Sequence, residues 1–321
     1  MTAVVGIDLG GTKVAVSELR GGTLGECHQQ PTQLGSSEQL LDQLVSMVRT
    51  VGDGFDAVGI GVPSVVEFAT GRVVSSVNIP LVDVPLREVL GRRLGVPVFV
   101  DNDATVAALA EAHDAELTLT ARNLVMLTIG TGVGGGLVLG GRIYRGATGG
   151  AGELGHTIVG LDLAGAVPTP MGFPQPGSLE FVAAGHALDR LAAQSATLHP
   201  RSELGRLHAA GLPVLGPDAV QAAHDGDPAA LRIVEIWGQR VGIGIANAIN
   251  TFDPEEVVIG GGAARAGDLM LAPAERVARG YVVPGLGGAT RIRLARHGAD
   301  AGVLGAALLA RYELEDGSGE P

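Results

Sequence analysis

The 321-residue sequence is poor in cysteine and in aromatic side chains. Its single cysteine, Cys27, excludes an intrachain disulfide, which is typical of a reducing compartment. Aromatic residues make up only 3% of the chain, so aliphatic side chains have to fill the core. Because glycine appears 51 times, we expect many turns or close backbone contacts that depend on it.

The sequence also lacks an excess of basic residues and any long apolar run. Lys and Arg number 22 against 34 Asp and Glu, which gives a formal net charge of −12. That balance argues against nucleic acid and against an anionic membrane surface as partners, since both require clustered positive charge. No run approaches the roughly 20 apolar residues that span a bilayer. Met1–Ile7 has no charged leader, so we expect a cytoplasmic protein.

The order of apolar segments predicts alternating strands and helices. Strands are expected at 4–8, 14–19, 57–62, 98–100, 124–129, 137–139 and 257–259. Helices are expected at 37–51, 104–113, 179–194, 228–250 and 303–311. This alternation indicates an α/β fold. A strand, a glycine-rich loop and a second strand occur twice, at 4–19 and at 124–139, which predicts two related lobes.

Three glycine clusters each follow an apolar strand, at 10–13, 130–136 and 260–262. Glycine lets backbone N–H groups approach an anion with no side chain between them. None of the clusters has the Walker spacing, and none opens a helix as a dinucleotide fingerprint does. One such loop alone is as often a tight turn as a phosphate site. Three of them, two with a threonine beside glycine, favour phosphate binding.

The polar cluster Asp101-Asn102-Asp103 lies between a predicted strand and a predicted helix. One interpretation is that an aspartate of this cluster is simply the N-cap of the helix. The other is that Asp103 accepts the proton of an alcohol during phosphoryl transfer, where a loose transition state demands little of the base. The two interpretations are compatible.

Together with Gly152-Glu153-Leu154-Gly155-His156, these motifs resemble the signatures of the ROK (repressor, open reading frame, kinase) sugar kinases, bacterial glucokinases above all. The resemblance runs from residue 4 to about residue 310. It implies a two-lobed actin/hexokinase-like ATPase fold of duplicated ribonuclease-H-like domains. We expect a smaller lobe of residues 1–118 with a helix at about 303–312, a larger lobe of 119–302, and a disordered tail at 313–321.

The resemblance also implies a role for individual residues. Asp8 would lie near Mg²⁺, through water. The ATP phosphates would face Gly10, Gly11, Thr12 and Lys13 from one lobe and Thr131 and Gly132 from the other, with Gly261 and Gly262 near the adenosine. The sugar would be bound by Ser64, Asn78, Asn102, Asp103, Glu153, His156 and Glu180. The alternative for His156 is a purely structural histidine, and the alternative for Glu180 is a glutamate that stabilises the first turn of a helix. Relatives often have glycine at 64, where a serine hydroxyl could select the hexose or only cap a turn.

One segment departs from the family pattern. Most members carry three cysteines after the histidine and hold a structural zinc with them. Here the cysteine positions are taken by Thr169 or Met171, by Phe173 and by Ser178, none of which is a zinc ligand. We therefore predict no zinc. Proline stiffness and the packing of Phe173 and Met171 would then hold Glu180, with Ser178 capping the following helix.

The resemblance implies ATP-dependent phosphorylation of a hexose hydroxyl, glucose at O6 first, with Asp103 as general base and ATP and Mg²⁺ as cofactors. An amino hexose, an N-acetylated hexose or fructose is the alternative substrate. A sugar-sensing regulator would need a helix-turn-helix, for which we expect no room before residue 8. A non-catalytic ATP-binding switch would lack the Glu153–His156 pair. A homodimer is expected because it is usual in the resembled family.

Overall fold

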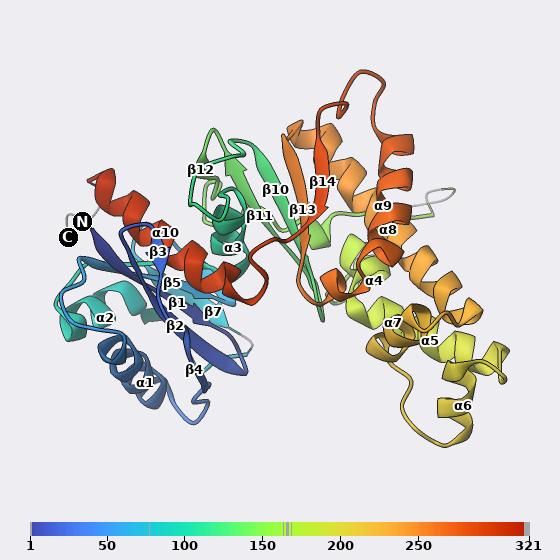
Figure 1. Ribbon diagram of the computed structural model, residues 1–321, viewed down its shortest axis with the longest axis horizontal. Helices are drawn as coiled ribbons and strands as arrows, with labels where there is room; N and C mark the ends of the chain where they lie inside the picture. The colour runs from blue at the N-terminus through green and yellow to red at the C-terminus, as the bar shows by residue number, and fades with distance from the viewer. Residues whose placement is uncertain (1, 77, 163, 165–166, 168, 318–321) are drawn as a thin grey trace. The chain divides into compact units, whose positions relative to one another are not determined.

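The computed structural model describes residues 2–76, 78–162, 164, 167 and 169–317. These residues form two compact units (Figure 1). The first contains the described parts of 1–124, 136–152 and 296–321, and the second contains 125–135 and 153–295. These bounds differ from the expected lobes mainly at 136–152. That segment belongs to the first unit because Arg145, within it, forms ion pairs with Asp101 and Glu313.

The first unit is built on a sheet of strand order β3-β2-β1-β5-β9, with β4 paired to β2. Its strands are β1 (Ala3–Leu9), β2 (Lys13–Arg20), β3 (Thr23–Leu24), β4 (His28–Pro31), β5 (Ala57–Val62) and β9 (Val98–Asn102). A small second sheet contains β6 (Ser64–Glu67), β7 (Arg72–Ser76) and β8 (Val84–Pro85). The helices are α1 (Ser37–Thr50), α2 (Leu86–Leu94), α3 (Asp103–Glu111) and α10 (Ala301–Glu315).

The alternation of side chains along β1 decides what each face of the first sheet contacts. Val5, Ile7 and Leu9 belong to the aliphatic core that the sheet shares with α1 and α2. Because successive side chains point to opposite faces, Gly6 and Asp8 face the other way, toward α10. One strand therefore supplies both a core stripe and a carboxylate on the opposite face.

The other large sheet has the strand order β12-β11-β10-β13-β14. Its strands are β10 (Leu124–Ile129), β11 (Val133–Leu139), β12 (Arg142–Ile143), β13 (Glu256–Gly260) and β14 (Arg291–Leu294). The helices of the second unit are α4 (Leu179–Ala183), α5 (Gly185–Leu198), α6 (Glu203–Ala209), α7 (Gly216–His224), α8 (Pro228–Phe252) and α9 (Asp268–Tyr281). Short 3-10 helices lie at Leu154–His156, Gly262–Ala266 and Gly298–Asp300.

The two large sheets repeat one arrangement. In each, the strand that enters the glycine loop lies between its hairpin partner and two later strands: β2-β1-β5-β9 in one and β11-β10-β13-β14 in the other. The later strands pair in parallel, β5 with β9 and β13 with β14. The predicted duplication of strand, glycine loop and strand is therefore confirmed, as is the mixed α/β class.

Two predicted helices have different ends. The helix expected at 179–194 is broken at Ala184, which is extended, and the N–H of Gly185 donates instead to the carbonyl of Gly130 in the second glycine loop, at 2.7 Å. The last helix continues to Glu315, so the prediction of a disordered tail from Glu313 is wrong for its first three residues. Residues 318–321 of that predicted tail lie outside the described residues.

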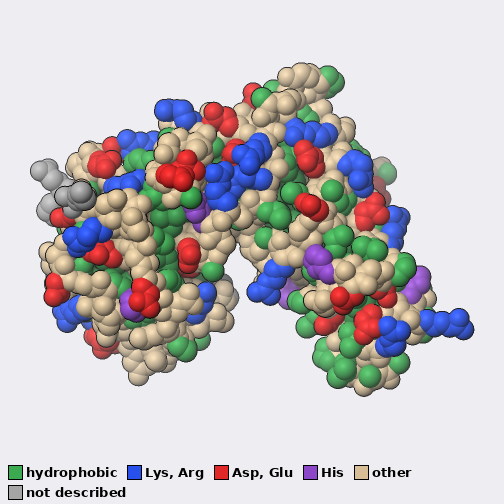
Figure 2. Space-filling model, viewed as in Figure 1, with side chains coloured by type: hydrophobic (Ala, Val, Ile, Leu, Met, Phe, Trp, Pro, Cys, Tyr) green, Lys and Arg blue, Asp and Glu red, His purple; other side chains and the backbone are tan. Residues whose placement is uncertain are grey.

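The surface in view mixes charges of both signs. Figure 2 shows red carboxylates among the blue Lys and Arg side chains rather than a face of one sign. Within the described ranges, no helix has both the length and the apolar character that crossing a membrane requires.

Candidate active site

Three parallel strands of the first unit bring two acidic segments to one edge of the sheet. Asp8 of β1 is in register with Gly61 of β5, and Gly61 is in register with Asp101 of β9. The carboxyl ends of parallel strands open on one side of such a sheet, which is where ligands bind in α/β folds. Asp8 and the segment 101–103 therefore lie at the same sheet edge, as a shared site requires.

Asp8 is enclosed by the start of α10. A Cβ added to Gly302, in the first turn of α10, would lie 2.5 Å from the carboxyl carbon of Asp8. Burial raises the pKa of the Asp8 carboxyl above its usual value, and the nearby charge of Lys13 opposes the rise. The carboxylate thus occupies a site where its charge is costly unless a cation joins it.

Asp8→Asn is expected to stabilise the fold. Because the folded-state pKa of Asp8 lies above the unfolded one, its contribution to stability is greatest below the ordinary aspartate range and is lost as the pH rises through the folded pKa. Asparagine has no charge to bury. Thermal unfolding should therefore show a higher Tm than the parent at pH 7, with the gap closing toward pH 4. Asp42→Asn, at an exposed carboxylate, is the control and should show no gain.

The first glycine loop is a tight hairpin held from outside. The N–H of Gly10 donates to the carbonyl of Lys13 at 2.9 Å, and the Thr32 hydroxyl donates to the carbonyl of Gly10 at 2.7 Å. A Cβ on Gly11 would lie 2.9 Å from the Cβ of Asn78. The exposed Asn78 therefore lies beside the predicted phosphate loop. Thr12 and Lys13 are exposed at the tip.

The N-cap of α3 is Asn102, so the interpretation that an aspartate caps this helix is wrong. Its Oδ1 accepts the N–H groups of Ala104 at 2.9 Å and Thr105 at 3.3 Å, while its Nδ2 donates to the carbonyl of Ser64 at 3.4 Å. Asparagine is among the best N-caps because its oxygen reaches these free donors. This leaves Asp103 as the first helical residue, half-buried, with its Oδ1 accepting the N–H of Ala104 at 2.8 Å.

Ser64 lies against this cap through its carbonyl. Its side chain is buried, and its hydroxyl has no hydrogen-bond partner among the described residues. The interpretation that this hydroxyl caps a turn is therefore wrong. A buried hydroxyl without a partner is uncommon, because a buried polar group that makes no hydrogen bond costs free energy of folding.

A buried ion-pair network lies behind Asp103. Arg145 Nε is 2.7 Å from Asp101 Oδ2, and the other oxygen of Asp101 accepts the N–H of Asn102 at 2.9 Å. The same guanidinium is 2.9 Å from Glu313 and 3.4 Å from the ring centre of Phe68. Burial raises the pKa of Asp101, and Arg145 opposes that rise. The network connects α10 to the residues that precede the candidate base.

Arg145→Gln is expected to lower the free energy of unfolding by about 3 kcal/mol, because it leaves the buried Asp101 without its partner charge. Urea unfolding measures the loss. The matched control is Arg142→Gln, three residues earlier, whose ion pair with Asp316 is exposed and should be worth less than about 1 kcal/mol. Equal losses in the two variants would contradict the assigned role.

The second glycine loop, in the second unit, is held by α4 and α5. Glu180 of α4 accepts the N–H of Val133 through Oε2 at 2.8 Å, and the N–H of Gly130 donates to the carbonyl of Gly132 at 2.9 Å. Thr131 is exposed at the loop tip. The glutamate expected in the sugar pocket therefore also fixes the predicted phosphate loop, through a carboxylate bond to a backbone N–H.

Glu153 and His156 are at the two ends of a 3-10 turn that packs on the same loop. Glu153 Oε2 lies 3.7 Å from His156 Nε2, and both side chains are accessible. The intervening Gly155 contacts Val133 so closely that a Cβ would lie 2.0 Å from its carbonyl oxygen. The structure thus brings Glu153, His156 and Glu180 around one glycine loop.

The segment that replaces the zinc loop is organised differently from the prediction. Phe173 meets the His156 ring edge-on, with 5.1 Å between ring centres, but Phe173 and Met171 are 75% and 68% exposed, so they do not fill a buried space. Ser178 does cap α4, since its hydroxyl accepts the N–H of Phe181 at 3.2 Å. In the described part of the chain, no group of three or more His, Cys, Asp or Glu side chains is arranged to hold a metal ion.

The prediction that the chain binds no zinc has a direct check. Metal analysis of the protein purified without chelator is expected to find far less than one zinc per chain, because no residue at the family's cysteine positions supplies a thiolate to join His156. EDTA should then leave the Tm unchanged in the absence of Mg²⁺. One tightly held zinc per chain would contradict the prediction.

A cavity of about 480 Å³ opens beside the second glycine loop. Gly130, Thr131 and Gly262 form one wall, α5 and α7 contribute most of the others, and Trp237 of α8 also lines the cavity. Gly261, which precedes Gly262, has φ of 75°, a left-handed conformation that favours glycine. The size suits a nucleoside. The predicted adenosine-side glycines therefore line or adjoin a real cavity.

The sequence reasoning missed the α5 and α7 walls of this cavity. Asp189 of α5 lies 3.2 Å from the ring of His186 and accepts the N–H of Gly216, at the start of α7, at 2.6 Å. Gln221 and His224 of α7 also line the cavity. The spacing of His186 and Asp189 on a helix is one signal that could have found these walls, and Pro217 with Asp218 at the start of α7 is another.

Comparisons with known proteins show what the whole chain is similar to. The model of the ROK family matches residues 4–313. A glucokinase of Halalkalibacterium halodurans is 34% identical over 322 residues, covering 96% of this chain and 95% of that protein. Among solved structures, a ROK hexokinase from Thermus thermophilus has a TM-score of 0.77 and 36% identity, covering 98% of this chain and all of that one. A ROK glucokinase from Streptomyces griseus, solved with glucose and AMPPNP, has a TM-score of 0.77 and 30% identity, over 97% and 99% of the two chains.

Proposed function

Because this chain belongs to the ROK family, we propose that it is an ATP-dependent glucokinase that converts glucose to glucose 6-phosphate. The observation that carries the proposal is the shared sheet edge of Asp8 and the segment 101–103 in the first unit. Such a reaction needs two acidic groups. One carboxylate helps to bind the cation, and the other accepts the proton of the alcohol.

The proposed chemistry is proton acceptance by Asp103 as the γ-phosphoryl group of ATP passes to the sugar oxygen. The O6–P bond forms, the bond to the leaving ADP oxygen breaks, and the hydroxyl proton passes to Asp103. In phosphoryl transfer, catalysis is mostly positioning and charge stabilisation. Since the N–H of Gly10 closes the hairpin on Lys13, the remaining backbone N–H groups of Gly11–Lys13, and those of Thr131 and Gly132, would supply donors for the phosphates. Closure around the substrates would exclude water, so that sugar rather than water receives the phosphate.

Mg²⁺ fits the residues present, because Asp8 offers oxygen ligands in a site where its own charge is disfavoured. When bound, Mg²⁺ neutralises charge on the phosphates. Asp8 would hold it through water. The sugar would contact Glu153, His156 and Glu180, whose carboxylate and imidazole groups suit vicinal hydroxyls. Since the Asn102 oxygen caps α3, its share in sugar binding would fall to the amide N–H₂.

A coupled assay of ATP consumption tests the proposal. Glucose should raise ATP consumption strongly over the rate without sugar, and ³¹P NMR should identify a 6-phosphate product. A faster rate with an N-acetylated or amino hexose, or with fructose, would keep the kinase but change its substrate. ATP consumption that no sugar changes would overturn the proposal in favour of an ATP-binding switch. We further expect a cytoplasmic protein that forms a homodimer. Light scattering on the purified chain measures its molar mass and so tests the homodimer.

A further inference from the structure

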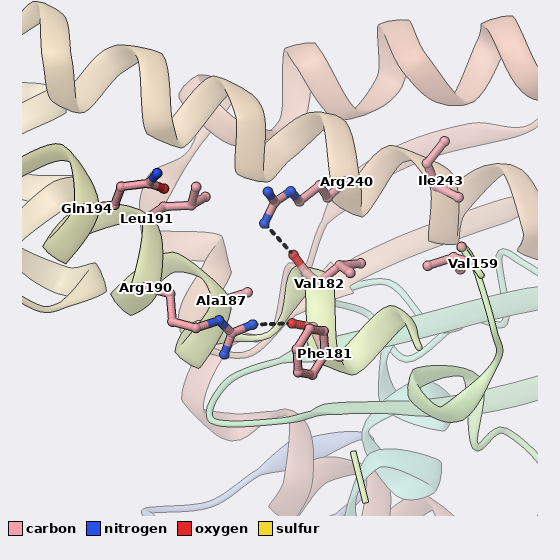
Figure 3. Close-up of a pocket in the computed structure, with 10 residues that line it drawn as sticks. Val159, Phe181, Val182, Ala187, Arg190, Leu191, Gln194, Arg240 and Ile243 are labelled. Carbon is pink, nitrogen blue, oxygen red and sulfur yellow. Dashed lines mark hydrogen bonds between the residues drawn. The ribbon is translucent and has the colours of Figure 1, made fainter. Parts of the chain in front are cut away.

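A second cavity of the second unit, of about 540 Å³, has no residue of the second glycine loop in its lining (Figure 3). Its walls come from α4, α5 and α8 and from the segment at 159–160. The volume suits a small ligand. None of the residues assigned above to catalysis or to substrate binding lines it.

Two arginines reach into this cavity from different helices. Arg190 of α5 lies over the ring of Phe181, with 4.8 Å from its guanidinium carbon to the ring centre, and donates to the carbonyl of Phe181. Arg240 of α8 donates to the carbonyl of Val182 at 3.3 Å. Figure 3 shows both side chains converging on the last turn of α4. These contacts orient the exposed Arg190 and the half-buried Arg240 toward α4.

The cavity brings two positive charges together without an acidic side chain in its lining. The described residues that line it include no Asp or Glu, and the hydrogen bonds described for Arg190 and Arg240 go to backbone carbonyls. Burial lowers the pKa of Arg240, and the charge of Arg190 lowers it further. Since a half-buried cation beside a like charge is unfavourable, the arrangement would gain from an anion.

Each guanidinium retains donors for such an anion. Arginine carries five N–H groups in a fixed fork, of which the carbonyl contact uses a small part. Two forks supply two positive charges, which match the two negative charges of a phosphate monoester. The rest of the lining includes the apolar Leu191 and Ile243 and also Gln194, which can donate and accept hydrogen bonds. We propose that Arg190 and Arg240 form a binding site for a small phosphate-bearing molecule, separate from the glycine loops.

The test is a titration with inorganic phosphate, followed by calorimetry and by thermal unfolding against an ionic-strength-matched chloride control. The parent should bind phosphate saturably and gain Tm. Arg190→Gln and Arg240→Gln should each weaken binding by at least about tenfold, the loss typical for hydrogen bonds to a charged group. Arg201→Gln, at an exposed arginine of the same unit, removes the same charge and should leave binding unchanged. Phosphate that binds at the glycine loops is common to all four chains, so the difference isolates the arginine pair.

A second arm distinguishes the sources of the phosphate group. Glucose 6-phosphate should bind tighter than inorganic phosphate if the apolar wall contacts the rest of the ligand, and equally if the free anion is the ligand. Arg190→Lys and Arg240→Lys retain the charge without the fork and should bind at intermediate strength, which keeps the test valid if a glutamine variant misfolds. Equal phosphate affinity in the parent and in the Arg190 and Arg240 variants, or an equal loss in Arg201→Gln, would overturn the site.

Discussion

Asp103→Asn is expected to lower kcat about a thousandfold while leaving the binding of glucose and nucleotide unchanged, because asparagine cannot accept the hydroxyl proton. The structure makes this an unusually clean substitution. Asp103 is the first residue of α3, but the cap of that helix is Asn102, so the helix start does not depend on the aspartate. The Asp103 oxygen that accepts the N–H of Ala104 is retained as an amide oxygen.

Steady-state kinetics and calorimetry separate the possible outcomes for this variant. The free energy of unfolding should change by about 1 kcal/mol at most, the value of a carboxylate in the first turn of a helix. Asn102→Ala is the matched comparison, because it removes the cap and should cost stability of about 1 kcal/mol whatever its effect on turnover. Turnover near the parent rate in Asp103→Asn would remove the proposed base from the mechanism.

The sequence was sufficient to predict the parts of the fold that depend on local patterns. Apolar runs that end in glycine loops identified β1 and β10, and the repeated motif predicted the repeated strand order. The run Asp227-Pro228 fixed the start of α8, since Asp227 accepts the N–H groups of Ala229 and Ala230 there. Capping and strand alternation are decided within a few residues, and this is why they can be read without a structure.

What the sequence did not reveal depends on partners distant along the chain. The break between α4 and α5 is set by the bond from Gly185 to Gly130, 55 positions away in numbering, which no periodicity encodes. The helix at 313–315 continues because Glu313 pairs with Arg145. The role of Glu180 at Val133 likewise needs the fold, since a first-turn glutamate has the same local pattern with or without that contact.

The residues of the candidate site were predicted through resemblance, and the structure adds the reasons why they lie where they do. Asp8 and Asp101 lie at the same sheet edge because Gly61 of β5, the strand between theirs, is in register with both. The cavity beside the second glycine loop was incompletely predicted, because its α7 wall has a polar and apolar composition typical of any surface helix.

Gly155→Ala is expected to lower kcat/KM for glucose by about a hundredfold, mostly through a higher KM. The added methyl group would lie 2.0 Å from the carbonyl oxygen of Val133, and a backbone atom cannot yield as a flexible side chain does. The 3-10 turn that carries Glu153 and His156 must then move away from the second glycine loop, and displacements of about 1 Å in a site can cost two orders of magnitude. The same overpacking should lower the free energy of unfolding by about 1–3 kcal/mol.

Gly172→Ala provides the control, because no heavy atom of the described residues beyond its chain neighbours lies within 4 Å of the position its Cβ would take. It should leave both KM and stability unchanged. Nucleotide affinity measures how far the disturbance spreads. Because the N–H of Val133 donates to Glu180, a shift of Val133 should also weaken nucleotide binding, whereas a shift of the 3-10 turn alone should not. A Gly155→Ala chain with the parent KM for glucose would show that Glu153 and His156 do not have to remain packed on the loop, and would remove them from the proposed sugar site.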